Sequence, residues 1–374
     1  MIKVTDKHKC CGCEACAQRC PKQCITMISD VEGFLYPHVN ETLCIDCGMC
    51  VNVCPVINQS KPKRPLNVYA AINPDENIRH NSSSGGIFTA FAEKVIDEGG
   101  VVFGALFNDE WEVVHAYVEQ VEDLFRLRGS KYVQSKIGIS YHEVETFLKS
   151  GRIVLFSGTP CQVAGLNNYL RKGYDNLLTI EVVCHGVPSP KVWNDYISTL
   201  ENYSPIRCVN MKDKTDGWIQ YKITITGESG ILSERASDNK YMLAFSSDLV
   251  LRPSCYQCPA KDLKSGSDIT LADYWGVENL IPKMFDDKGT SFVCINTAKG
   301  QTIFNELQID REKADYDKSI PYNSCIIKST SEPSSRPVFW DQYAVKGIQA
   351  LFDLEPIRIN FIKRTVCWIK RKLQ

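Results

Sequence analysis

The sequence predicts an α+β protein in which a small cysteine-rich domain precedes a larger mixed α/β domain. Two four-cysteine runs lie within the first 58 of its 374 residues. Farther along the chain, short apolar segments typical of buried strands alternate with segments of helical periodicity. This alternation favours a mixed sheet covered by helices. The length is sufficient for two or three domains.

The two cysteine runs share one spacing, C-x2-C-x2-C-x3-C-P, and form an internal repeat. This is the spacing of bacterial ferredoxins with two 4Fe-4S clusters, where the fourth cysteine of each run ligates the other cluster. We therefore predict two clusters in a ferredoxin-type domain over residues 1–58. The first cluster would be held by Cys10, Cys13, Cys16 and Cys54, and the second by Cys44, Cys47, Cys50 and Cys20.

A zinc site or a disulfide framework is the alternative for these cysteines. Zinc sites use C-x2-C pairs separated by a longer stretch, so two identical runs with a trailing proline favour iron-sulfur chemistry. Cys24 lies outside the pattern and is interpreted as a small buried hydrophobic residue. Cys11 also lies outside it, and the spacing assigns it no role.

The larger domain is expected over residues 67–345, after a proline-containing linker at 59–66. Its N-terminal part would span about 67–145 and its C-terminal part about 150–310. We predict helices at 85–98 and 163–171, a short helix at 121–127, and buried strands at 101–106, 151–157 and 177–183. Residues 220–226 alternate polar and apolar side chains, which predicts a half-exposed strand.

A serine- and glycine-rich loop precedes the first predicted helix. It comprises Ser82, Ser83, Ser84, Gly85 and Gly86. Hydroxyl groups and free N–H groups at a helix N-terminus form a site for a phosphate or another anion. An ordinary serine N-cap explains the same residues equally well.

Four further cysteines lie in loops that follow predicted strands or in a separate C-x2-C pair. They are Cys161, Cys184, Cys255 and Cys258. Four thiolates are compatible with a third 4Fe-4S cluster or with zinc, and buried free cysteines are the remaining alternative. His185 is a weak catalytic candidate, as a proton carrier, with a turn residue bonded to the backbone as the plainer alternative. Four cysteines without spacing partners are predicted to be structural: Cys208, Cys294, Cys325 and Cys367.

Composition excludes several other classes of protein. The formal net charge of -1 gives no reason to expect a nucleic acid as partner. The first residues are polar, so we expect no secretory signal, and reduced cysteines suit a cytoplasmic location. No apolar stretch is long enough to cross a membrane. Residues 346–374 are predicted to form a basic helical tail, which either packs on the body or contacts an anionic membrane peripherally.

Several segments of the chain together resemble a known family. They are the two cysteine runs, Ser82–Phe88, Gly129–Ser135, Phe156–Gln162, Cys184–Ser189, Asp268–Gly276 and Gly289–Ser291. In combination they resemble the coenzyme F420 hydrogenase/dehydrogenase beta-subunit family, in the bacterial form with an N-terminal ferredoxin domain. The resemblance covers about residues 5–310.

The resemblance implies an oxidoreductase that moves electrons between 4Fe-4S clusters, FAD and an organic two-electron acceptor. It implies that FAD is held by the Ser82–Gly86 loop and by Lys131, Tyr132, Gln134 and Ser135. It implies that the four loop cysteines hold a third 4Fe-4S cluster near the flavin. Ferredoxin or another redox protein is the expected partner, and coenzyme F420 is one possible acceptor. A non-catalytic electron-transfer subunit serving a partner enzyme is the alternative function.

Overall fold

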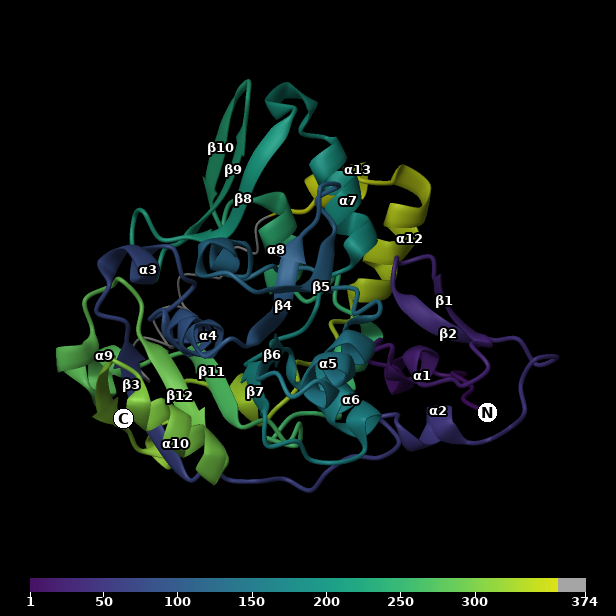
Figure 1. Ribbon diagram of the computed structural model, residues 1–374. Coiled ribbons are helices and arrows are strands. Elements are labelled where there is room, and N and C mark those ends of the chain that lie inside the picture. Colours follow the sequence, from purple (N-terminus) through teal and green to yellow (C-terminus); the bar gives the residue numbers. More distant parts are fainter. Residues whose placement is uncertain (356–374) are drawn as a thin grey trace.

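The computed structural model describes residues 1–355, which surround one eight-stranded mixed sheet (Figure 1). The strand order is β13-β3-β12-β11-β7-β6-β4-β5. The strands are β3 (Asn67–Ile72), β4 (Val101–Phe107), β5 (Val113–Val118), β6 (Val154–Gly158), β7 (Leu177–Val182), β11 (Ile269–Asp273), β12 (Ser291–Ile295) and β13 (Asp310–Lys313). β4, β6, β7 and β11 are parallel neighbours, whereas β12 runs antiparallel to both β11 and β3. The carboxyl ends of β3, β4, β6, β7 and β11 therefore meet at one edge.

Helices cover both faces of the sheet because successive side chains of its central strands point to opposite sides. In β4, Val102 packs toward one face and Val101 and Phe103 toward the other. The first face is covered by α4 (Ile87–Asp97) and α10 (Ala298–Glu306), and the second by α5 (Ser140–Lys149) and α6 (Pro160–Leu170). This burial on both sides explains why the strands read as continuous apolar runs.

The N-terminal domain contains the hairpin β1 (Ile25–Ser29) and β2 (Leu35–Val39) and two one-turn helices, α1 (Ala15–Gln18) and α2 (Met49–Asn52). The internal repeat is visible in the backbone, because α1 and α2 begin 34 residues apart. Each follows a residue with positive φ, namely Glu14 (60°) and Gly48 (73°). The domain packs beside α5 and α6 (Figure 1).

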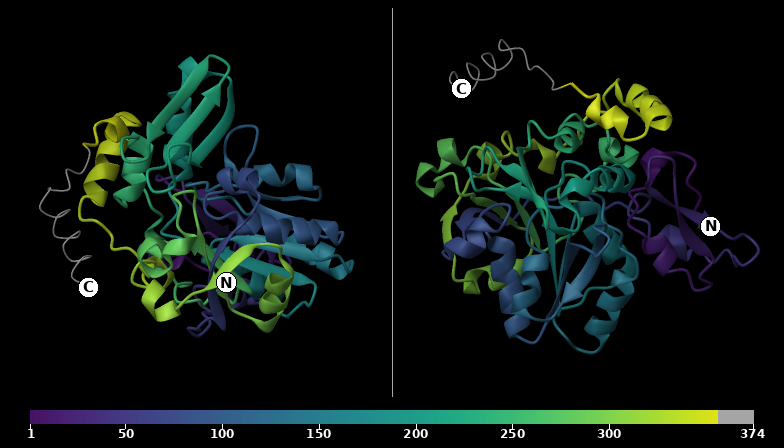
Figure 2. Two further views of the ribbon diagram at one scale, coloured as in Figure 1. Left: turned by 90° about the vertical axis from the view of Figure 1, so that its left-hand side faces the viewer. Right: turned by 90° about the horizontal axis from the view of Figure 1, so that it is seen from above.

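A second, three-stranded sheet projects from the main body (Figure 2). It consists of β8 (Ile206–Asp213), β9 (Lys222–Gly227) and β10 (Gly230–Arg235). Its inner face shares a core with four helices: α7 (Pro190–Ser198), α8 (Lys240–Ser246), α12 (Arg336–Lys346) and α13 (Gln349–Phe352). Short helices α3 (Glu76–His80), α9 (Val277–Leu280) and α11 (Tyr316–Ser319) complete the described fold.

The predicted fold class is confirmed, with a small N-terminal domain and a larger α/β body. The predicted helix at 85–98 is α4, and the predicted strands at 101–106, 151–157 and 177–183 are β4, β6 and β7. The short helix predicted at 121–127 is a 3-10 helix at Val121–Arg126, and the half-exposed strand at 220–226 is β9. The helix predicted at 163–171 begins earlier, at Pro160, because Thr159 and Gln162 form a capping box.

The predicted linker is described in full, and the predicted helical tail only in part. The 59–66 segment has no helix or strand and is bonded to the body by Lys63 N–H to Asp262 O and Leu66 N–H to Ile295 O. The predicted basic tail lies outside the described residues from 356 onward, as does Cys367. Among residues 1–355, no helix has the length and apolarity needed to cross a membrane.

Candidate functional site

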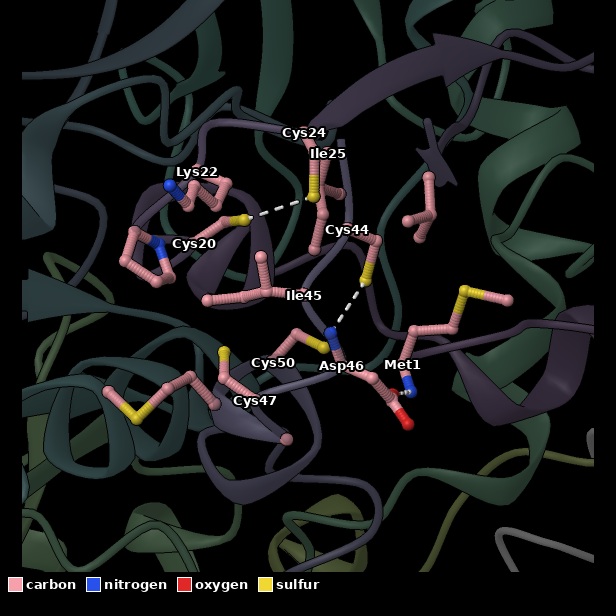
Figure 3. A pocket seen from close by; sticks show the side chains of 14 residues that line it. Met1, Cys20, Lys22, Cys24, Ile25, Cys44, Ile45, Asp46, Cys47 and Cys50 are labelled. Carbon is pink, nitrogen blue, oxygen red and sulfur yellow. Dashed lines mark hydrogen bonds and ion pairs between the residues drawn. The ribbon is translucent and has the colours of Figure 1, made fainter. Parts of the chain in front are cut away.

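An open cavity in the N-terminal domain is lined by the cysteines predicted to hold the second cluster (Figure 3). These are Cys20, Cys44, Cys47 and Cys50, and Cys24 lines the same cavity. Cys20 therefore lies with the second run although it belongs to the first. The cavity is near the surface, since Ile45 and Cys47 are exposed.

The first predicted set lies deeper in the molecule. Cys13, Cys16 and Cys54 are buried and Cys10 is half-buried. Burial raises the pKa of Cys16, and the charges of Cys10 and Cys54 act in the same direction. Cys54 thus comes together with the first run, as the crossed assignment requires. A carbon atom at the Cβ position of Gly165 would lie 3.1 Å from Cys13 Sγ, so this set packs directly on α6.

The four loop cysteines of the body line one further open cavity. Cys161 is the second residue of α6, directly after β6, and Cys184 follows the adjacent strand β7. Cys255 lies in a short 3-10 helix, and Cys258 ends it. The cavity is therefore at the carboxyl edge of the parallel strands, where ligands of open α/β sheets bind. We call it the core cavity.

A fifth cysteine, Cys11, also lines the core cavity. Its thiol is close enough to Cys161 to share a hydrogen bond that raises the pKa of Cys161. Because Cys11 is bonded through one peptide to Cys10, the first N-terminal set and the core cavity are covalent neighbours. Nothing in the spacing identified this role, since Cys11 breaks the C-x2-C pattern.

The thiols of the core cavity are held neutral by their surroundings. Burial raises the pKa of Cys255 to about 12 and that of Cys258 to about 11. Metal ligation requires thiolates, so loading this site must release protons. Within residues 1–355, no three Cys, His, Asp or Glu side chains converge on a point where one ion could bind. The cysteines instead surround cavities.

His185 lies at the rim of the core cavity, beside Cys184. Its Nε2 is 2.5 Å from Asp248 Oδ1, and Asp248 also accepts a hydrogen bond from Thr330. The interpretation of His185 as a turn residue bonded to the backbone is wrong, because its partner is a carboxylate. The ring also contacts Phe245 edge-on, with 5.8 Å between ring centres.

The two segments predicted to hold FAD meet at one hydrogen-bonded junction. Ser130 N–H donates to Ser83 Oγ at 2.6 Å, and the two hydroxyl oxygens are 2.8 Å apart. Ser82 and Ser84 donate instead to the carbonyl oxygens of Ile78 and Thr290. These two hydroxyls therefore brace the loop, and α4 begins directly after Gly86.

The Lys131–Ser135 segment connects this junction to the core cavity. The Tyr132 ring stacks on Phe245 at 4.9 Å, and Phe245 contacts His185. Lys131 Nζ donates to the carbonyl oxygens of Arg126 and Arg128, and burial lowers the pKa of this lysine to about 7.

Gln134 and Ser135 face the cysteine sites. Gln134 Nε2 donates to Cys11 O at 3.1 Å, and Ser135 Oγ accepts from Gln162 on α6 at 2.8 Å. Both residues therefore support the walls around the cysteines.

The remaining cysteines differ in their surroundings. Cys294 is fully buried in β12, consistent with a structural residue. Cys325 is half-buried, and its carbonyl oxygen accepts from Lys261. Cys208 is exposed on β8, so the expectation of a packed structural role is wrong there.

Most of the chain matches the models of three protein-domain families. Residues 9–58 match the 4Fe-4S dicluster domain. Residues 68–138 match the N-terminal part, and residues 151–316 the C-terminal part, of the coenzyme F420 hydrogenase/dehydrogenase beta subunit. The two beta-subunit matches together span more than half of the chain.

Individual relatives each match about half of this chain. An uncharacterized protein of Methanocaldococcus jannaschii is 28% identical over 47% of this chain and 56% of its own length. The coenzyme F420-dependent sulfite reductase of the same organism is 27% identical over 56% of this chain and 33% of its own. One of the subunits of the F(420)H(2) dehydrogenase of Methanosarcina mazei is 25% identical over 43% of this chain and 49% of its own.

The chain thus spans about half or less of the length of these curated relatives. Among solved structures, a chain of the F420-reducing NiFe hydrogenase complex of Methanosarcina barkeri aligns over 71% of this chain and 90% of that chain. The two are 17% identical, with a TM-score of 0.47. With its N-terminal 4Fe-4S dicluster domain and both parts of the beta subunit, this chain belongs to the coenzyme F420 hydrogenase/dehydrogenase beta-subunit family.

Proposed function

We propose that this chain is an iron-sulfur flavoprotein oxidoreductase that connects a one-electron redox protein to an organic two-electron acceptor. Three groups of cysteines would hold 4Fe-4S clusters: the exposed second N-terminal set, the buried first set and the core cavity. The observation that carries the proposal is the position of Cys11, which joins the first set to the core cavity. The three sites would therefore form a series that runs from the exposed second set through the first set to the core cavity.

The residues around these sites would bind the clusters and the flavin, orient them and exclude water. The four thiols of each set match the ligand requirement of a 4Fe-4S cluster, and the carboxyl edge of the sheet brings two of the core thiols together. FAD would be held by the Ser82–Gly86 loop with Lys131 and Tyr132, whose junction at Ser83 and Ser130 supports a shared ligand. Clusters transfer single electrons and a flavin exchanges one or two, which is the chemistry these groups supply when bound.

Coenzyme F420 is the first acceptor to test, because two matched relatives carry it in their names. The donor would be ferredoxin or a similar redox protein, which would dock near the exposed second set. Anaerobic reduction assays with reduced ferredoxin and a panel of acceptors, F420 included, identify the acceptor by its spectral change.

Cofactor content tests the proposal directly. Protein purified without oxygen is expected to contain about twelve irons, with matching sulfide, and one FAD per chain. A zinc-containing protein, or one without flavin, would contradict it.

In the Cys255→Ser, Cys258→Ser double variant, about one third of the iron should be lost, because only the core cavity loses ligands. Cys208→Ser is the matched control, since that thiol is exposed on β8, and it should retain all of the iron.

A non-catalytic electron-transfer subunit is the second candidate function. One relative is itself named as a subunit of a dehydrogenase, which favours a chain that works with a partner. Protein that ferredoxin reduces, but that passes electrons to no small molecule, would support this alternative. Turnover of an acceptor by the isolated chain would exclude it.

A further inference from the structure

Arg252 is fully buried between the first N-terminal set and the core cavity. Its Nε donates to Cys10 O at 2.7 Å, and its Nη2 donates to Leu35 O at 2.9 Å and lies 3.5 Å from Cys10 Sγ. Its Nη1 donates to Gln134 Oε1 at 3.0 Å, and the ring of Tyr36 lies 4.3 Å from the guanidinium carbon. The guanidinium is thus immobilised against the first cysteine of the chain.

No carboxylate pairs with this buried charge among the described residues. Its partners are carbonyl oxygens, an amide oxygen and a thiol. The nearby Glu14 carboxylate accepts hydrogen bonds from the N–H groups of Ile137 and Gly138 and not from Arg252. Burial raises the pKa of Glu14, and the Arg252 charge lowers it by a smaller amount. Buried charges are normally paired, because desolvation of an isolated ion is costly. An anionic cluster held by Cys10 would supply the charge partner that Arg252 lacks among the described residues.

The local backbone is shaped around Arg252. A Cβ atom at Gly12 would lie 2.6 Å from Arg252 Nη1 and 2.8 Å from Gln134 Nε2, and Gly12 has a φ of 68°. Gln134 holds the next carbonyl, that of Cys11, at 3.1 Å. Residues 10–12 therefore fold closely over the guanidinium, which fixes its distance to the cluster ligands.

We propose that Arg252 is the counter-ion of the first N-terminal cluster and keeps the reduction potential of this cluster above that of the second. The inference rests on the proposed function, because it requires clusters on both cysteine runs. A cluster with four thiolates is anionic and becomes more so on reduction. A fixed buried cation therefore stabilises the reduced form more than the oxidised form and raises the potential.

The second cavity has no comparable charge in its described lining. The charged groups there are Lys22, Asp46 and the N-terminal ammonium of Met1. Lys22 and Asp46 are exposed and screened by water, and the ammonium is already paired with Asp46. In such a transfer the second cluster would lose one electron and the first would gain it, with no bond formed or broken and no proton moved. By raising the potential of the first cluster, Arg252 would favour the transfer of electrons from the exposed site toward the core cavity.

The variant Arg252→Gln in the full chain tests this effect. Anaerobic redox titration followed by electron paramagnetic resonance gives the midpoint potentials of the clusters. We expect full iron content and a lower midpoint potential of the first N-terminal cluster. The equilibrium of one electron between the two N-terminal clusters should move at least tenfold toward the second. For a one-electron centre, tenfold corresponds to about 59 mV.

Two controls separate charge from structure. Arg336 is also buried and also holds the N-terminal domain to the body, but it is paired with Glu32. The double variant Glu32→Gln, Arg336→Gln removes both charges of this pair and should therefore leave both N-terminal midpoints unchanged. Lys22→Gln, at the exposed rim of the second cavity, should do the same.

A second variant keeps the arginine in place. In Gln134→Glu, a carboxylate replaces the amide that accepts from Arg252 Nη1, so the guanidinium gains a protein counter-ion. The same midpoint should fall even if Arg252→Gln does not fold. Loaded variants with unshifted potentials would overturn the inference and leave the proposed function intact. Wild-type protein without iron-sulfur signals would overturn both.

Discussion

At the scale of single residues, the cysteines outside the ferredoxin spacing have roles that the spacing did not predict. Cys24 is buried, as predicted, but its Sγ lies 3.4 Å from Cys20 Sγ and it lines the second cavity. Cys11, which the sequence left without a role, lines the core cavity. Spacing identifies thiols that are close along the chain, whereas these two reach their sites through the path of the surrounding loops.

The buried His115 gives the protein a defined sensitivity to acid. Its Nε2 is 3.1 Å from Ser157 O and its Nδ1 is 2.9 Å from Ser135 Oγ, so the ring is held as the neutral Nε2–H tautomer. Burial lowers the pKa of His115 to about 4 from 6.5. Between these values the unfolded chain binds a proton that the folded chain does not, so stability falls as pH falls through this window.

The expected loss in free energy of unfolding reaches about 3 kcal/mol near pH 4. Chemical denaturation of the wild type between pH 7 and pH 5 should show the onset of this loss in the free energy of unfolding. His115→Gln should have a flatter profile over the same range, and an unchanged slope would rule out His115 as its source.

At the scale of elements, α6 connects two of the proposed cluster sites. Its first turn carries Cys161 for the core cavity, and its middle carries Gly165 against Cys13 of the first N-terminal set. A glycine inside a helix normally costs about 0.5–1 kcal/mol relative to alanine. Here it is required, because a Cβ atom would lie 2.8 Å from Tyr141 Oη and 2.9 Å from Cys13 Cβ.

Gly165→Ala should therefore destabilise the protein although alanine favours helix. We expect a loss of about 1–3 kcal/mol in the free energy of unfolding, the usual cost of overpacking, together with a changed spectrum of the first cluster. Denaturant unfolding and electron paramagnetic resonance provide the two measurements. Gly173→Ala, where no atom lies within 4 Å of the new Cβ, should leave both unchanged.

At the scale of the whole molecule, the N-terminal domain is fixed to the body by buried contacts. Glu32, at the tip of the β1–β2 hairpin, forms a buried ion pair with Arg336 of α12. Arg336 Nη1 is 3.0 Å from Glu32 Oε1, and its Nη2 donates to Leu251 O at 3.0 Å. Because Arg252 also holds this turn, through the carbonyl oxygen of Leu35 at the start of β2, the hairpin is fixed to the body from two sides.

Arg336→Met should cost about 3–5 kcal/mol, since it leaves the Glu32 carboxylate buried without its partner. The double variant Glu32→Gln, Arg336→Met should recover part of this loss. Unfolding free energies give the coupling, and limited proteolysis at residues 59–66 reports release of the domain. Additive losses in the double variant would show that the pair does not hold the domains together.

The sequence by itself determined that the chain begins with a 4Fe-4S dicluster domain and that the larger domain follows it. A cluster imposes its spacing on residues that are neighbours along the chain, so two runs and a C-x2-C pair are visible without a structure. Strands buried on both faces are visible for a similar reason, because most of their residues are apolar. Strands β11 and β12 were not predicted, since their places depend on pairing with β7 and β3, which lie far away along the chain. Helix α5 and strand β5 were not predicted either.

Tertiary structure alone decided how the sites relate to one another. The meeting of Cys11 with the core cavity, and of Arg252 with Cys10, joins residues more than 100 positions apart. Such contacts leave no periodic signal, because they arise where a loop of one domain packs against the sheet edge of another. The ligands of the proposed clusters can therefore be predicted from the local sequence. The order of the cluster sites in space depends on how the two domains pack together.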